Sequence, residues 1–120
     1  MFRLDPSAEY AGISLAYDMD LAPAFLVERF GTPLPGDGSR CTGRYVFVDP
    51  SGSVFTVYEY KCTAAYRDDE DDALPPAEFW QCTDPQELSV GNRGGLGDAT
   101  ARPFVQWLTA EYQAWRSAGG

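Results

Sequence analysis

The sequence contains no histidine and only one lysine, Lys61, among its 120 residues. Without histidine the chain cannot form a Ser-His-Asp triad, a Cys-His pair or a histidine-ligated metal site. It also lacks the side chain that most often serves as a general base near neutral pH. No S-x-x-K motif places Lys61 beside a nucleophilic serine. These absences argue against an enzyme, and the sequence assigns no catalytic residue.

Long apolar runs are lacking too, and the N-terminal segment does not begin with basic residues followed by an apolar stretch. A membrane-spanning helix needs about 20 mostly apolar residues, and a secretion signal needs a basic start before its apolar region. We therefore expect a cytoplasmic protein that makes no contact with a membrane.

Cysteine is scarce, with Cys41, Cys62 and Cys82 far apart in the sequence. An odd number of cysteines without a secretory signal favours reduced thiols over a disulfide framework. Zinc sites without histidine use paired C-x-x-C ligands, which this sequence does not contain. No metal ion and no cofactor are predicted.

Basic residues are half as numerous as acidic ones, 9 against 18, so the net charge is −9. This excess disfavours nucleic acid as a partner, because nucleic-acid binding needs a basic face. Five of the acids form a run at 68–72, within a predicted loop at about 67–76. The run does not fit the calcium-loop pattern and is typical of a solvated, self-repelling segment. The rest of the surface is only mildly acidic, which leaves room for a local anion site.

With 44% apolar residues, the chain has the composition of an ordinary globular protein and a length suited to one domain, 1–120. The segment 20–30 predicts a short helix, with Asp20 as the N-cap, Pro23 in the first turn and Gly31 as the stop.

Residues 43–61 predict a β-hairpin, because β-branched and aromatic runs flank the turn sequence Asp49-Pro50-Ser51-Gly52. Alternating residues of the second strand put apolar side chains on both faces. Either both faces of the sheet are covered, or one face opens as a pocket lined by aromatic side chains.

Farther along, EFWQCT and ELSV read as two short strands, and 13–17 is ambiguous between an edge strand and a helix. From Thr100 onward, apolar residues recur at helical spacing. Their positions are Phe104, Trp107, Leu108, Tyr112 and Trp115. Together, these predicted helices and strands indicate an α+β fold. It has an antiparallel sheet of three to five strands with the hairpin at its centre, a short N-terminal helix and a C-terminal amphipathic helix packed on the sheet.

The segment GNRGG stands after a predicted strand and before a predicted helix, as phosphate-binding loops do. It fits neither established glycine-rich motif, so a plain glycine-rich connection is the alternative. Because Arg93 lies in this segment, we expect it to converge with Arg40 and Lys61 on one anion site. At least one nearby aromatic ring would stack on the ligand, although core packing is the more common role for each of these rings taken singly. The aromatic candidates are Tyr45, Tyr58, Tyr60 and Trp80.

Several short motifs between about residues 25 and 110 resemble a family of small accessory proteins of tailed phages. The motifs are Phe30-Gly31-x-Pro33, Gly36-Asp37-Gly38-x-Arg40, Thr42-Gly43-x-Tyr45, Val57-Tyr58-x-Tyr60-Lys61, Phe79-Trp80, Val90-Gly91-Asn92 and the helical segment Phe104 to Leu108. The family often has lysine in place of Arg40 and Gly-Gly in place of Gly91-Asn92. No established activity comes with the resemblance. It implies a viral protein in the host cytoplasm, where small phage proteins frequently counter host defence.

These observations predict a non-enzymatic anti-defence protein, a sponge that sequesters a small nucleotide immune signal. The alternative is an acidic inhibitor of a basic host protein, or a toxin-immunity protein, acting by electrostatic complementarity. The sequence leaves open whether the chain forms a homo-oligomer.

Overall fold

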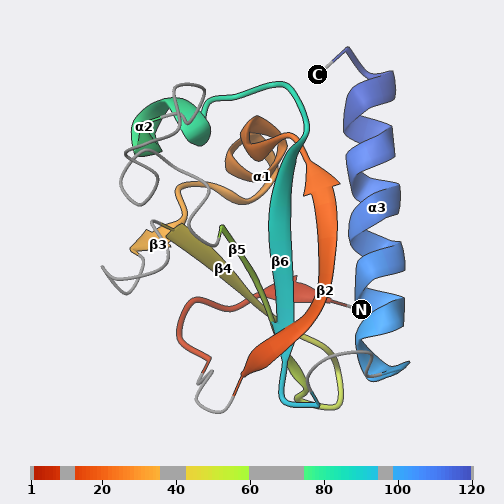
Figure 1. Ribbon diagram of the computed structural model, residues 1–120. Helices are drawn as coiled ribbons and strands as arrows, with labels where there is room; N and C mark the ends of the chain where they lie inside the picture. The colour runs from red at the N-terminus through yellow and green to blue at the C-terminus, as the bar shows by residue number, and fades with distance from the viewer. Residues whose placement is uncertain (1, 9–12, 36–42, 60–74, 95–98, 120) are drawn as a thin grey trace.

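Helices and strands both contribute to the structure, a computed structural model that describes residues 2–8, 13–35, 43–59, 75–94 and 99–119 (Figure 1). This confirms the predicted α+β class. In chain order the elements are β1 (Arg3–Leu4), β2 (Ser14–Leu21), α1 (Pro23–Phe30), β3 (Leu34–Pro35), β4 (Gly43–Val48), β5 (Val54–Tyr58), α2 (Pro76–Phe79), β6 (Gln86–Asn92), the 3-10 helix η1 (Ala99–Ala101) and α3 (Arg102–Ser117).

The strands form one antiparallel sheet in the order β1-β4-β5-β6-β2, with β3 also paired to β4. The predicted hairpin is confirmed as β4 and β5 at the centre of this sheet, while Tyr60 and Lys61 at its predicted end lie outside the described residues. Six strands are present instead of three to five. The additional strands β1 and β3 have two residues each, too few to show an alternating pattern in the sequence.

The first helix begins at Pro23, so the predicted start at Asp20 was wrong. Asp20 belongs to β2, where it pairs with Glu87 of β6, and Ala22 occupies the N-cap position without a capping hydrogen bond from its side chain. Strand pairing outweighs the capping preference of aspartate here. Gly31 ends the helix as predicted, with φ of 91° and its N–H bonded to the carbonyl of Val27.

The ambiguous segment 13–17 lies in an edge strand, since β2 spans Ser14–Leu21 and pairs only with β6 along the sheet. The predicted strand ELSV is confirmed within β6. The other predicted strand, EFWQCT, was wrong: Phe79 closes the short helix α2, and Cys82 continues the turn with its N–H bonded to the carbonyl of Phe79. Phe79 and Trp80 are buried by tertiary contacts, which explains why this apolar segment resembled a strand.

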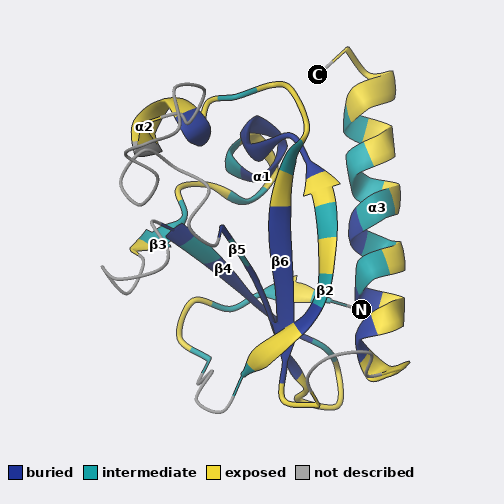
Figure 2. Cartoon of the chain, viewed as in Figure 1, coloured by how far each residue is buried: buried dark blue, intermediate teal, exposed yellow. Residues whose placement is uncertain are grey.

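One face of the sheet packs against α1 and α3, and the main core lies between them (Figures 1 and 2). Phe104 of α3 stacks on Phe55 of β5, with 4.9 Å between ring centroids and 8° between ring planes. Phe47 of β4 also contacts Phe104, at 5.3 Å. The predicted packing of the C-terminal helix on the sheet is therefore confirmed.

The opposite face is covered over its central part by a smaller cluster, in which Val46, Val48 and Val54 pack beneath Ala8, Ile13 and Leu34. Of the two arrangements left open by the sequence, this part of the hairpin adopts the one with both faces covered. None of the helices within the described ranges is long and apolar enough to cross a membrane.

Gly91 of β6 lies directly beneath two side chains of the smaller face. A Cβ atom at this position would lie 2.7 Å from Ile13 Cγ2 and 2.8 Å from Thr56 Oγ1, closer than van der Waals contact permits. The backbone oxygen of Ser14 would be 3.2 Å away. Glycine is required here because of this close approach between neighbouring strands.

We predict that Gly91→Ala lowers the free energy of unfolding by about 1–3 kcal/mol, the usual cost of overpacking a core site. Urea denaturation followed by circular dichroism measures the change. In an Ile13→Ala background the added cost should be smaller, because the nearest clashing atom is gone. Unchanged stability of the single Gly91→Ala variant would contradict this account.

Candidate functional site

The turn between β4 and β5 meets the end of β6 and the start of α3 at one end of the sheet. Between them lies a depression of about 280 Å³. Its lining consists of Ser51, Gly52, Ser53, Val54, Phe55, Asn92, Arg93, Gly94 and Thr100. Among the described residues of this lining, Arg93 is the charged one and none is acidic. We call this the inner depression.

A wider and more open depression of about 720 Å³ adjoins it. Its lining consists of Arg3, Asp5, Ala8, Val48, Asp49, Pro50, Gly52, Val54 and Arg93. Arg93 borders both hollows. We call the second hollow the outer depression; it brings Arg3, from the first strand, into the same region as Arg93.

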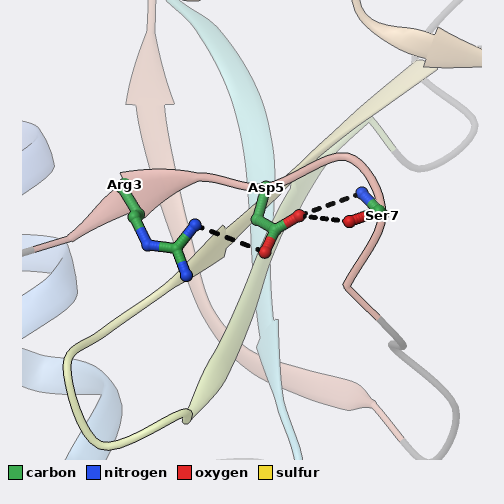
Figure 3. Close-up of polar contacts among 3 residues, drawn as sticks. All are labelled: Arg3, Asp5 and Ser7. Atoms are coloured by element: carbon green, nitrogen blue, oxygen red, sulfur yellow. Dashed lines mark hydrogen bonds and ion pairs between the residues drawn. The ribbon is translucent and has the colours of Figure 1, made fainter.

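Arg3 forms an exposed ion pair with Asp5, with 3.4 Å between Nη1 and Oδ2 (Figure 3). The other oxygen of Asp5 accepts hydrogen bonds from the hydroxyl and the backbone N–H of Ser7, at 2.7 and 3.1 Å. The hydroxyl of Ser7 is the main cause that lowers the pKa of Asp5 below its ordinary value, and Arg3 adds to this effect. Asp5 is therefore ionised at neutral pH and partly offsets the charge of Arg3.

The side chain of Asp49 stabilises the hairpin turn through hydrogen bonds to other residues of the turn. Its Oδ1 accepts hydrogen bonds from the backbone N–H groups of Ser51 and Ser53, at 3.0 and 2.9 Å, and from the Ser51 hydroxyl at 2.7 Å. Partial burial raises the pKa of Asp49, but these hydrogen bonds outweigh burial and the pKa is lowered overall. The amides of Ser51 and Ser53 are thus committed to an internal carboxylate.

The start of the C-terminal helix faces the inner depression through Thr100. The side-chain amide of Asn92 donates a hydrogen bond of 3.1 Å to the Thr100 hydroxyl, and this bond ties the end of β6 to the helical segment. The first turn of α3 has no acidic residue and begins with Arg102. A helix N-terminus carries a partial positive charge. The start of the helical segment therefore adds a field favourable to an anion on the side of the inner depression that Thr100 borders.

Of the predicted site residues, the structure places only Arg93 here; Arg40, Tyr60 and Lys61 lie outside the described residues. Tyr45 is 2% exposed and belongs to the main core. Its hydroxyl donates a 2.7 Å hydrogen bond to the carbonyl of Gly31.

Trp80 is 8% exposed and meets the Tyr45 ring edge-on, with centroids 6.0 Å apart. These two rings fill space in the core. The structure therefore favours the core-packing alternative that the sequence left open for them.

Tyr58 is partly exposed and lies beside Arg44 of β4 and Ser89 of β6. Phe55, which borders the inner depression, pairs with Asn92 three residues earlier in β5. At about 3.3 Å per residue, Tyr58 lies about 10 Å farther along the strand. The structure thus separates Arg93 from the aromatic candidate Tyr58, and convergence with Arg40 and Lys61 stays a prediction.

Two kinds of residue that border the depressions were not predicted from the sequence. Arg3 reaches the outer depression because β1 pairs Arg3 with Val48, a long-range contact that no local motif signals. The hydroxyl-bearing residues Ser51, Ser53 and Thr100 border the inner depression. Ser51 belongs to the predicted turn and Ser53 begins the predicted strand that follows it, so their position next to a strand end was the available signal.

Comparison with protein-family models and with curated proteins finds no match for this chain. Among the described residues, no three acidic or cysteine side chains approach one another closely enough to hold a metal ion. Cys82 is a free thiol, and Cys41 and Cys62 lie outside the described ranges.

Burial raises the pKa of the Tyr45 hydroxyl above the ordinary tyrosine value of about 10. Below that pH both folded and unfolded chains keep the proton. Above it the unfolded chain releases the proton and the folded chain retains it, so stability falls as pH rises, by up to about 1.4 kcal/mol per pH unit.

We predict that Tyr45→Phe lowers stability at neutral pH by about 1 kcal/mol, because the hydrogen bond to Gly31 is lost. Above about pH 10 the variant should lose stability less steeply than the wild type. Urea titrations between pH 7 and pH 11.5 measure both effects. Parallel alkaline slopes for the two proteins would show that Tyr45 does not cause the decline.

Proposed function

We propose that this protein binds a small phosphorylated ligand of the nucleotide class without chemical conversion, and that the phosphate lies in the inner depression. The observation that carries the proposal is the position of Arg93, which borders both depressions where β6 leads toward α3. A guanidinium in this setting can donate two parallel hydrogen bonds to phosphate oxygens.

Other groups around Arg93 fit the same ligand chemistry. The Ser51 hydroxyl already donates to Asp49, and its oxygen lies 3.3 Å from the hydroxyl of Ser53. Ser53 is therefore the donor in this contact, and a bound phosphate would take over the proton that Ser53 now donates to Ser51. The positive end of α3 adds a favourable field for an anion.

The size of the two hollows indicates how a nucleotide fits. The inner depression of about 280 Å³ is at the lower limit of ligand sites, which suits a phosphate with its sugar. The outer depression supplies apolar surface from Val48, Pro50 and Val54, against which a base can lie, and Arg3 for a second phosphate. This arrangement replaces the stacking on Tyr45 or Trp80 that the sequence suggested.

Ionised Asp5 and Asp49 border the outer depression and oppose binding of a highly charged anion there. A ligand with few phosphates is therefore favoured over a polyphosphate chain. Together with the resemblance to tailed-phage accessory proteins, this supports a sponge for a nucleotide immune signal that acts in the host cytoplasm.

Arg93→Ala should weaken nucleotide binding about tenfold or more, since a charge-assisted hydrogen bond contributes roughly 1.5–3 kcal/mol. Isothermal titration calorimetry with ADP and with a cyclic dinucleotide measures the affinities. Mass spectrometry of small molecules retained from a defence-activated cell lysate extends the search to other nucleotides. Arg3→Ala should have a smaller effect, because Arg3 borders only the outer hollow.

Arg116→Ala is the matched control, because it removes the same charge from the last turn of α3, far from the depressions. It should leave the affinity unchanged. The proposal fails if no nucleotide is retained, or if Arg93→Ala and Arg116→Ala retain the same nucleotide equally well.

A further inference from the structure

The strand β2 forms one margin of the sheet and is the longest strand in the described part of the chain, with eight residues from Ser14 to Leu21. One of its edges pairs with β6, and no described strand pairs with the other (Figure 1). Strands of this length normally offer a row of backbone donors and acceptors to another chain, and natural proteins protect such edges with charges and bulges.

Several side chains of β2 are exposed to solvent. Leu15 is 37% exposed, and Asp18 and Asp20 are exposed as well (Figure 2). The large rings of α3 contact Phe47 and Phe55 on the central strands, so the helix is anchored over the middle of the sheet. The exposed side chains of β2 are thus accessible to a partner.

The two faces of β2 differ in chemistry along this margin. Asp18 and Asp20 lie on one face, and Asp20 pairs directly with Glu87 of β6. On the other face Tyr17 and Met19 are partly buried against the main core. A strand added beside β2 would therefore meet carboxylates on one side and apolar side chains on the other.

The pairing of Asp20 with Glu87 places like charges directly opposite each other, an arrangement that destabilises a sheet by itself. Asp18 stands two residues away on the same face, where it accepts a 3.1 Å hydrogen bond from the Ser89 hydroxyl. Positive charge brought alongside β2 would relieve this repulsion. The acidic face therefore selects for a basic partner.

We propose that the outer edge of β2 binds an extended segment of a partner protein in which basic and apolar residues alternate. The backbone of the segment extends the sheet, its basic residues face Asp18 and Asp20, and its apolar residues continue the face of Tyr17 and Met19. A second copy of this chain is a poor occupant, because antiparallel pairing of two β2 strands would bring their carboxylates together. This surface is separate from the depressions and does not depend on nucleotide binding.

A capped eight-residue peptide of alternating lysine and valine is the probe. Its affinity is measured by calorimetry at low ionic strength, and amide hydrogen exchange followed by NMR locates its binding. We expect slower exchange within residues 14–21. A peptide of the same sequence with alternate backbone nitrogens methylated should bind about tenfold more weakly or worse, because it cannot complete the ladder of hydrogen bonds.

The variant Asp18→Asn, Asp20→Asn should weaken binding by about fivefold or more, because it removes the charges that face the lysines. The variant Glu28→Gln, Glu78→Gln is the matched control, since it removes two exposed carboxylates from α1 and α2 and should leave the affinity unchanged. The proposal is overturned if the peptide does not bind, if the methylated peptide binds equally well, if protection appears only outside β2, or if both double variants weaken binding alike.

Discussion

The contact between α3 and the sheet holds together the parts of this protein that matter for its proposed function. Phe104 stacks on Phe55, and Phe2 contacts both rings edge-on, with centroids 5.3 and 5.6 Å away. This aromatic cluster fixes the start of α3 beside the hairpin turn. It also holds β1 in place, so that Arg3 reaches the outer depression. Site geometry and core packing thus depend on the same rings.

The elements with strong local patterns could be predicted from the sequence. The hairpin has β-branched runs around a turn that Asp49 stabilises through its own side chain, and α3 shows an apolar stripe over several turns. Where local signals compete with tertiary pairing, prediction was wrong. Asp20 has the chemistry of an N-cap, but pairing with Glu87 makes it part of β2. Phe79 and Trp80 are buried in the main core although they do not belong to a strand.

The same distinction applies to the candidate site. Arg93 could be identified because it follows a strand and precedes a helix, which is a local pattern. Arg3 could not, because its place depends on the pairing of β1 with β4. Tyr45 and Phe47 both belong to the main core on one face of β4, and the sequence did not reveal that the helices cover this face. The sequence alone therefore does not distinguish an aromatic ring that stacks on a ligand from one that packs in the core.

The topology has a consequence for the order in which the chain can fold during synthesis. Phe2 and β1 are synthesised well before their partners, which are in β4 and in α3. Likewise β2 cannot pair until β6 has been synthesised, because the hydrogen bond between Ser89 and Asp18 joins residues 71 positions apart. Contacts of this range form slowly, because a long stretch of chain must be ordered before they bring any gain. The nascent chain therefore exposes β2 without its strand partner until β6 has been made, a period in which an unpaired strand edge favours aggregation.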